Sequence, residues 1–197
     1  METQRNSGLL IVISSPSGAG KTSICKRLLK ENNKINVSIS DTTRAPRDNE
    51  INGNDYNFIS ENEFKKKIKN NEYVEFAKVF GNYYGSLKEN VNSILSAGND
   101  VLFDIDWQGA KQLRKSSYSN MLTFFIIPPS KDVIYERLKQ RAKMSGDDEK
   151  AINKRMSMYE TEMSHKQDYD HVVINEDIDK CITEIKELIT QKKLSII

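Results

Sequence analysis

Short apolar runs alternate with helical patterns along most of the chain. The runs are short and mostly apolar, as is typical of buried strands, and they lie at residues 9–13, 100–105, 121–127 and 171–175. The helical patterns lie at residues 22–31, 87–97, 130–141 and 178–192. Gly98 follows one helix as an end signal, and Ser130 precedes another as a cap. Strands that alternate with helices predict an α/β fold, with a mainly parallel sheet flanked by helices.

Residues 39–86 interrupt this alternation. They contain turn signals and two short strand-like runs, at 56–59 and 73–79. Between these runs Ser60 and Glu63 form a capping box that opens a small helix. We interpret this segment as an inserted, mostly antiparallel lobe.

A second interruption is the polar stretch at residues 143–148, which lies between two helices. Its composition predicts a hinge or a helical lid at about residues 141–155. The expected organisation is therefore a core made of residues 1–38 and 87–197, which carries both the lid and the inserted lobe.

The first predicted strand leads into a loop rich in glycine and serine, followed by a helix. In chain order the loop and the first helical residues are Ser15, Pro16, Ser17, Gly18, Ala19, Gly20, Lys21, Thr22 and Ser23. This context nearly matches G-x-x-x-x-G-K-[S/T], in which backbone N–H groups cradle phosphates, a lysine reaches the terminal phosphates and a hydroxyl ligates Mg²⁺. Ser15 replaces the usual first glycine, which is tolerable if its φ is negative. The alternative is a turn that binds nothing, but the strand–loop–helix context favours a nucleoside triphosphate site.

Composition excludes several other classes of protein. The formal net charge is only +2 over 197 residues, which disfavours a sequence-independent nucleic-acid binder. No apolar stretch approaches the roughly 20 residues that span a bilayer. Cys25 and Cys181 are too few for a disulfide framework or a zinc site, and we expect both to be packed side chains in a cytoplasmic protein.

The lobe holds polar residues that suit a second, phosphorylated ligand. Arg44 and Arg47 are three residues apart around a proline, and guanidinium groups bind phosphate oxygens as forks. Glu75 could accept two hydrogen bonds from the N1–H and N2–H₂ edge of guanine, which adenine cannot donate. The alternatives are surface arginines, a core role for Tyr84 and an exposed strand position for Glu75.

Several spaced segments together resemble the guanylate kinase family. They are residues 38–47, 50–58, 81–86 and 104–109, and the resemblance extends over about residues 9–189. It implies a P-loop NTPase core that binds ATP, a GMP-binding lobe and a helical lid. The implied reaction is transfer of the γ-phosphoryl group of ATP to GMP, and to dGMP, with Mg²⁺ as the cofactor.

The resemblance also implies roles for individual residues. The phosphate of GMP is expected at Arg44, Arg47, Tyr56 and Tyr84. The guanine is expected at Ser40, Glu75, Ser86 and Asp106. Asp104 is assigned to the GMP site and, with Thr22, to Mg²⁺. The catalytic cations are expected to be Lys21 and the lid arginines Arg137, Arg141 and Arg155, and Asn175 is expected near the adenine of ATP.

Two rival interpretations stay open at this point. One is a scaffold that kept the fold and lost the activity, although Lys21 and Thr22 are both present. The other is a kinase whose acceptor is AMP, UMP or dTMP. The expected partners are small molecules, with no nucleic acid or membrane, and the protein is expected to be a monomer or homodimer.

Overall fold

The core of the molecule is a five-stranded sheet. The computed structural model describes residues 8–48, 50–145 and 148–196, and of residues 141, 144 and 145 it describes only the backbone. In order across the sheet the strands are β2 (Ile35–Val37), β7 (Asp100–Asp104), β1 (Leu10–Ser14), β8 (Met121–Ile127) and β9 (His171–Ile174). All four neighbouring pairs are parallel, which confirms the predicted α/β fold.

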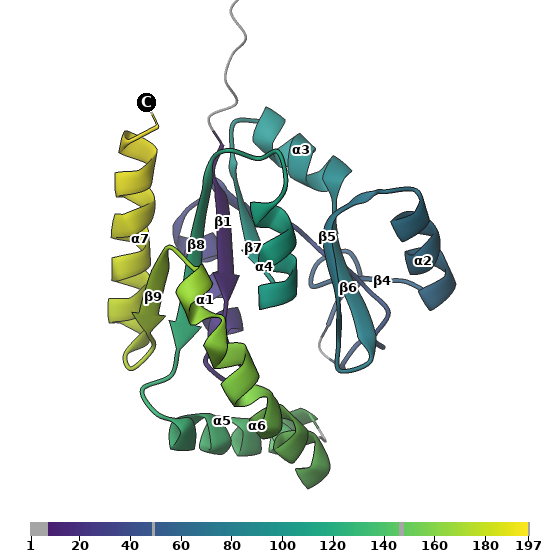
Figure 1. Cartoon of the computed structure of the whole chain (residues 1–197), viewed down its shortest axis with the longest axis vertical. Helices are drawn as coiled ribbons and strands as arrows, with labels where there is room; N and C mark the ends of the chain where they lie inside the picture. Colours follow the sequence, from purple (N-terminus) through teal and green to yellow (C-terminus); the bar gives the residue numbers. More distant parts are fainter. Residues whose placement is uncertain (1–7, 49, 146–147, 197) are drawn as a thin grey trace, which may run out of the picture.

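Helices cover both faces of this sheet (Figure 1). They are α1 (Lys21–Glu31), α3 (Lys88–Ser96), α4 (Trp107–Arg114) and α7 (Ile178–Leu194). Alternate side chains of a strand point to opposite faces. Ile11 and Ile13 of β1 accordingly pack with α1 and α7, whereas Leu10 and Val12 pack with α3 and α4. The sheet is therefore buried on both sides, as expected for parallel strands.

A second sheet forms the lobe beside this core. Its strands, in order, are β4 (Asn57–Phe58), β3 (Asp41–Thr42), β6 (Asn82–Leu87) and β5 (Tyr73–Val79), and α2 (Glu61–Lys69) precedes β5 in the chain. Only the short β3–β4 pair is parallel, so the predicted mostly antiparallel lobe is confirmed. The β5–β6 hairpin turns at Phe80 and Gly81, whose φ angles are 49° and 92°, as a two-residue hairpin loop favours.

Two further helices lie below the sheet in Figure 1. They are α5 (Lys131–Ser145) and α6 (Glu149–Ser164), which is followed by a 3₁₀ turn at Lys166–Asp168. Ile134 and Leu138 of α5 pack with Ile152 of α6 in a small apolar cluster of their own. This cluster is separate from the two that cover the sheet.

The observed elements include several for which no range was predicted, namely the helices α4 and α6 and the strands β2, β3 and β6. Strand boundaries in the core agree within one residue, but the three-residue strand β2 was not predicted because so short a run carries little pattern. The helix expected at 130–141 runs on to Ser145, so part of the expected hinge is helical, and residues 146–147 lie outside the described chain. Cys25 and Cys181 are buried free thiols, as expected. Among the described residues, no helix is long and apolar enough to cross a membrane.

Candidate active site

A cavity of about 640 Å³ opens between the core, the lobe and the two lower helices. Most of the predicted site residues line it: Ser15, Pro16, Ser17, Gly18, Gly20, Lys21, Thr22, Ser23, Ser40, Arg44, Arg47, Tyr56, Glu75, Tyr84, Asp104, Asp106, Arg137 and Arg155. Three others, Ala19, Ser86 and Asn175, are buried and do not line it. Ser86 is buried against Ser40, with 3.2 Å between the hydroxyl oxygens, and Asn175 donates a hydrogen bond to the carbonyl oxygen of Ala19 at 2.7 Å.

The phosphate-binding loop, residues 15–22, joins β1 to α1 at the carboxyl edge of the parallel sheet. Gly18 and Gly20 have φ angles of 89° and 96°, which a residue without a Cβ adopts at little cost. Ser15 is not among the described residues with a positive φ, so it meets the condition set for replacing glycine. No described side chain caps the start of α1, and the backbone N–H groups there can face an anion.

Lys21 contacts the carboxylate of Asp104 at the end of β7, and its ammonium also donates to the carbonyl oxygen of Ile105 at 3.3 Å. Burial alone would lower the pKa of Lys21, but the charge of Asp104, its hydrogen bond and smaller contributions from neighbouring groups together raise that pKa above its ordinary value. Lys21 is therefore a fixed cation at the centre of the cavity wall.

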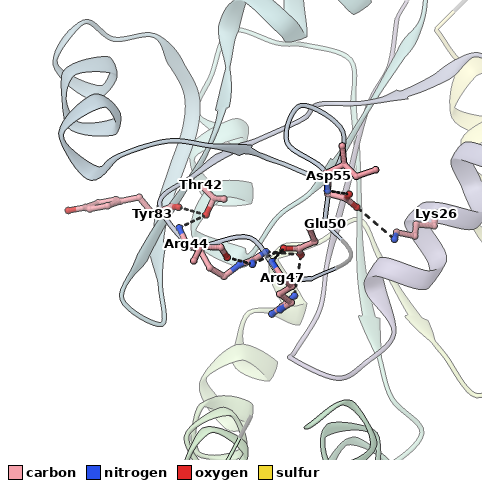
Figure 2. Close-up of polar contacts among 9 residues, drawn as sticks. Lys26, Thr42, Arg44, Arg47, Glu50, Asp55 and Tyr83 are labelled. Atoms are coloured by element: carbon pink, nitrogen blue, oxygen red, sulfur yellow. Dashed lines mark hydrogen bonds and ion pairs between the residues drawn. The ribbon is translucent and has the colours of Figure 1, made fainter. Parts of the chain in front are cut away.

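The arginine cluster of the lobe lines the same cavity as the loop at residues 15–22. Figure 2 shows the polar contacts of this cluster. Arg44 donates to both carboxylate oxygens of Glu50, at 2.8 and 2.9 Å, and its guanidinium lies 5.4 Å from the ring centre of Tyr56. The rings of Tyr56 and Tyr84 meet edge to face at 5.9 Å. Arg47 reaches the same Glu50 carboxylate at 3.4 Å. Two cations and two phenols are thus gathered on one wall, a set that suits a phosphate.

Glu75 lies at the inner end of the cavity, in β5, and its side chain is almost fully buried. Its Oε1 atom finds no hydrogen-bond partner among the described residues. Burial raises the pKa of Glu75 to about 7, with opposition from hydrogen bonds to Ser86 and a smaller contribution from the charge of Asp106. The exposed strand position considered for Glu75 is therefore excluded.

Two neighbours from the segment after β7 shape the surroundings of Glu75. Asp106 caps α4 by accepting hydrogen bonds from the N–H groups of Gln108 and Gly109, at 3.0 and 3.1 Å. A Cβ atom on Gly109 would lie only 2.3 Å from Oε2 of Glu75. The missing side chain of Gly109 therefore makes room for the Glu75 carboxyl group.

The lower helices bring arginines to the opposite side of the loop. Arg137 of α5 donates to the carbonyl oxygens of Ala19 and Asn175, at 3.2 and 3.4 Å. Arg155 of α6 lines the cavity, with its guanidinium 5.6 Å from the ring centre of Phe80 in the lobe. The side chain of Arg141 lies outside the described part of the chain.

Glu162 is a cavity residue that sequence reasoning missed. It lies on α6 and accepts a hydrogen bond from the backbone N–H of Ser17 at 3.1 Å. Burial raises the pKa of Glu162 to about 7, against the opposing effect of this hydrogen bond. In the sequence Glu162 is one of several acidic residues on a helix, and no spacing distinguishes it from Glu160.

A family model described as guanylate kinase matches residues 7–192 of the chain. The chain belongs to the guanylate kinase family. It is 46% identical to a guanylate kinase of Rickettsia felis over 191 residues, which cover 97% of each chain. It is 47% identical to a guanylate kinase of Bartonella henselae over 181 residues, which cover 92% of this chain and 80% of the relative. A crystal structure of guanylate kinase from Anaplasma phagocytophilum matches with a TM-score of 0.76 and 33% identity, over 94% of this chain and 86% of that chain.

Membership of the guanylate kinase family implies ATP-dependent phosphorylation of GMP. The family resemblance predicted from the spaced segments is confirmed by these comparisons over nearly the whole chain. The chain brings the loop at residues 15–22, the lobe arginines and the buried acid Glu75 to one cavity. Groups of these kinds suit a phosphoryl transfer between two nucleotides.

Proposed function

We propose that the protein transfers the γ-phosphoryl group of ATP, bound with Mg²⁺, to GMP and also to dGMP. The observation that carries this proposal is the shared cavity, where an anion-binding loop faces an arginine cluster and a buried, incompletely hydrogen-bonded carboxyl group. The loop would bind ATP and the arginine cluster the phosphate of GMP. The carboxyl group of Glu75 would bind the guanine edge. dGMP presents the same base and phosphate, so it is included as an acceptor.

Guanine recognition rests on the unpartnered oxygen of Glu75. Guanine would donate N1–H and N2–H₂ to the Glu75 carboxylate, with Ser40, Ser86 and Asp106 around it. Adenine has no N1–H and would leave a buried carboxylate unpaired, which costs about 1–3 kcal/mol or more for a charged group. Selection against AMP follows from that cost.

The chemistry needs positioning and positive charge rather than a general base. An oxygen of the GMP phosphate is already anionic at neutral pH, and it attacks the γ-phosphorus of ATP as the bond to the β-phosphate oxygen breaks and ADP leaves. Lys21, Arg137, Arg141 and Arg155 are the cations proposed to stabilise the charge on the transferred group. This role is supported by the side chains of Lys21, Arg137 and Arg155, which line the cavity.

The residues present fit an Mg²⁺ ion carried in with ATP. Among the described residues no three His, Cys, Asp or Glu side chains cluster as a metal cage. Mg²⁺ in nucleotide sites takes one or two protein oxygens together with phosphate oxygens and water, so no such cage is needed. The Thr22 hydroxyl and the Asp104 carboxylate, both on the cavity wall, are the proposed ligands. Bound there, Mg²⁺ would neutralise part of the phosphate charge.

We also propose that the lobe (residues 39–86) and the lid (about 141–155) close over the two nucleotides on a core of residues 1–38 and 87–197. Support comes from Arg155, which lies beside Phe80 of the lobe at the cavity rim, and from Arg137, which already contacts the phosphate-binding loop. Closure would assemble the arginines only when both substrates are bound, and so limit hydrolysis of ATP by water. ATP hydrolysis without GMP should then be far slower than transfer to GMP, and comparable rates would contradict closure.

The setting we propose is the cytoplasm, with the protein as a monomer or homodimer that binds no nucleic acid. Two buried free thiols and the near-balanced charge of +2 support it. Light scattering after gel filtration would give the oligomeric state.

The deciding experiment is ADP release from ATP and Mg²⁺ in parallel reactions with GMP, dGMP, AMP, UMP and dTMP. Turnover with GMP and dGMP alone is expected. Strong turnover with another acceptor would contradict the guanine-binding role of Glu75. If folded protein shows no turnover with any acceptor, the interpretation as a scaffold that kept the fold and lost the activity would be favoured instead.

A further inference from the structure

Glu50 is the common partner of the two arginines in the lobe. Figure 2 shows its carboxylate between Arg44 and Arg47. Oε2 accepts hydrogen bonds from the Arg44 guanidinium at 2.8 Å and from the backbone N–H of Arg47 at 2.9 Å. Oε1 accepts from the Arg44 guanidinium at 2.9 Å and from the Arg47 guanidinium at 3.4 Å. One carboxylate therefore orients both side chains.

The same residue closes the loop that carries the arginines. The backbone N–H of Glu50 donates to the carbonyl oxygen of Arg47 at 3.0 Å, while its carboxylate accepts the Arg47 N–H in return. Arg44 also donates to the carbonyl oxygen of Ala45 at 2.7 Å. Backbone and side-chain contacts thus fix the spacing of the two guanidinium groups together.

Charge favours this arrangement before any nucleotide is present. Two guanidinium groups that share a partner repel each other, and an anion between them offsets the repulsion. The Glu50 side chain is only 15% exposed. Partial desolvation opposes ionisation, but hydrogen bonds from Arg44 and the Arg47 backbone outweigh it and hold the pKa of Glu50 below its ordinary value. Glu50 is therefore charged at neutral pH.

Glu50 lies behind the arginines rather than in front of them. Arg44 and Arg47 line the cavity, whereas Glu50 does not. Its contacts engage three of the five N–H groups of Arg44 when the bond to Ala45 is included, and one N–H group of Arg47. The guanidinium groups can thus bind an incoming phosphate without displacing Glu50, so the carboxylate is a support and not a competitor.

We propose that Glu50 is a positioning residue for the acceptor nucleotide: it holds Arg44 and Arg47 in the orientation that binds the acceptor's phosphate. The inference rests on the proposed role of the two arginines in GMP binding. Glu50 touches neither nucleotide, and it acts only through the arginines. Its loss should therefore weaken the capture of GMP and leave the binding of ATP unchanged.

The test is Glu50→Gln, which keeps the size of the side chain and removes its charge. The matched control is Glu63→Gln, an exposed acid of the same lobe whose nearest ion-pair contact is Lys67 at 3.8 Å. We expect KM for GMP to rise about tenfold in Glu50→Gln because charge-assisted hydrogen bonds to both arginines are lost. KM for ATP should stay within twofold of wild type, and the control should match wild type in both.

A double-mutant cycle separates positioning from general destabilisation. In an Arg44→Ala background, Glu50→Gln should raise KM for GMP by clearly less than tenfold, because only Arg47 remains for Glu50 to position. If Glu50→Gln unfolds, as judged by circular dichroism, Glu50→Asp carries the test. It keeps the charge but is one methylene too short to reach both guanidinium groups, and KM for GMP should rise at least threefold.

Several outcomes overturn the inference. They are an unchanged or lowered KM for GMP in Glu50→Gln, an equal rise in KM for both nucleotides, and a full effect in the Arg44→Ala background. A wild-type protein that does not phosphorylate GMP would instead contradict the proposed function. The two failures are therefore distinguishable in the same assay.

Discussion

Two buried carboxylates in the lobe have opposite surroundings. Asp41 of β3 is fully buried, and it accepts hydrogen bonds from Asn57 at 3.0 Å and from Lys67 and Tyr73 at 2.8 Å each. Glu75 of β5 is 3% exposed, and its Oε1 has no partner among the described residues. Asp41 thus finds its hydrogen-bond donors within the lobe, whereas one oxygen of Glu75 finds none among the described residues.

The difference shows how a buried charge can indicate either stability or binding. Removing a carboxylate from water costs free energy unless hydrogen bonds and counter-charges offset it. Lys67 and two polar neighbours offset that cost for Asp41 inside the lobe. For Glu75 the cost is not fully offset, and burial raises its pKa to about 7. Its open side faces the cavity, where a guanine edge would supply the missing donors.

The largest expected effect comes from Glu75→Gln. An amide cannot accept both hydrogen bonds of the guanine edge, so kcat/KM for GMP should fall on the order of 10³-fold. Circular dichroism should show an intact fold, because no internal partner of Oε1 is lost. Initial rates with GMP and AMP measure the effect, and Glu61→Gln, an exposed lobe acid, is the control. If Glu75→Gln keeps the wild-type preference for GMP over AMP, Glu75 does not select guanine, and the proposed difference in role between Glu75 and Asp41 is wrong.

Asp41→Asn should act on stability instead. It removes the nearer of the two carboxylates that Lys67 pairs with, and breaking this pair, whose acid is fully buried, costs about 3 kcal/mol of unfolding free energy. Urea denaturation measures the loss. The preference for GMP over AMP should persist in the folded variant, because Asp41 does not line the cavity. A variant as stable as wild type would show that the paired acid contributes nothing to the lobe.

Sequence patterns were sufficient for the phosphate-binding loop and the long strands, because local spacing determines both. They also singled out Glu75, which the structure buries in the cavity wall, while its role in binding guanine stays a prediction. They did not reveal Glu162 or the room that Gly109 leaves, because those contacts join segments far apart in the chain. Glu50 lay inside a segment of the family resemblance, but its partners depend on how the loop folds back. Short strands such as β2 and β3 are defined by their pairing partners rather than by their own residues.

The protonation of Glu75 predicts a pH dependence for binding of the base. Only the carboxylate accepts both guanine hydrogen bonds, so affinity should fall as pH falls through about 7. Between pH 8 and pH 6 the ionised fraction changes about tenfold. Guanosine has no phosphate, so its inhibition constant against GMP avoids the titration of phosphate itself. We expect that constant to rise about tenfold from pH 8 to pH 6 in wild type and to be flat in Glu75→Gln. A flat wild-type profile would mean that the acid stays ionised across this range.

The same titration predicts a smaller effect on stability, of the opposite sign to that on binding. The folded pKa of Glu75, about 7, lies above the ordinary value of 4.5, so the folded protein binds a proton that the unfolded chain releases. This contribution to stability is complete below pH 4.5 and is lost as pH rises through 7. We expect this loss to be on the order of 1 kcal/mol.

Glu75→Gln isolates that effect, since the amide does not titrate. Urea denaturation at pH 5 and pH 8 should show Glu75→Gln gaining about 1 kcal/mol relative to wild type at the higher pH. Asp41→Asn should show no such gain, because its carboxylate is paired within the fold. If the unfolding free energies of the two variants depend on pH in the same way, the different surroundings of the two acids have no different effect on stability. A gain in stability seen only in Glu75→Gln would mean that the ionised carboxylate of Glu75 destabilises the nucleotide-free protein. That destabilisation would accompany the proposed role of Glu75 in binding guanine.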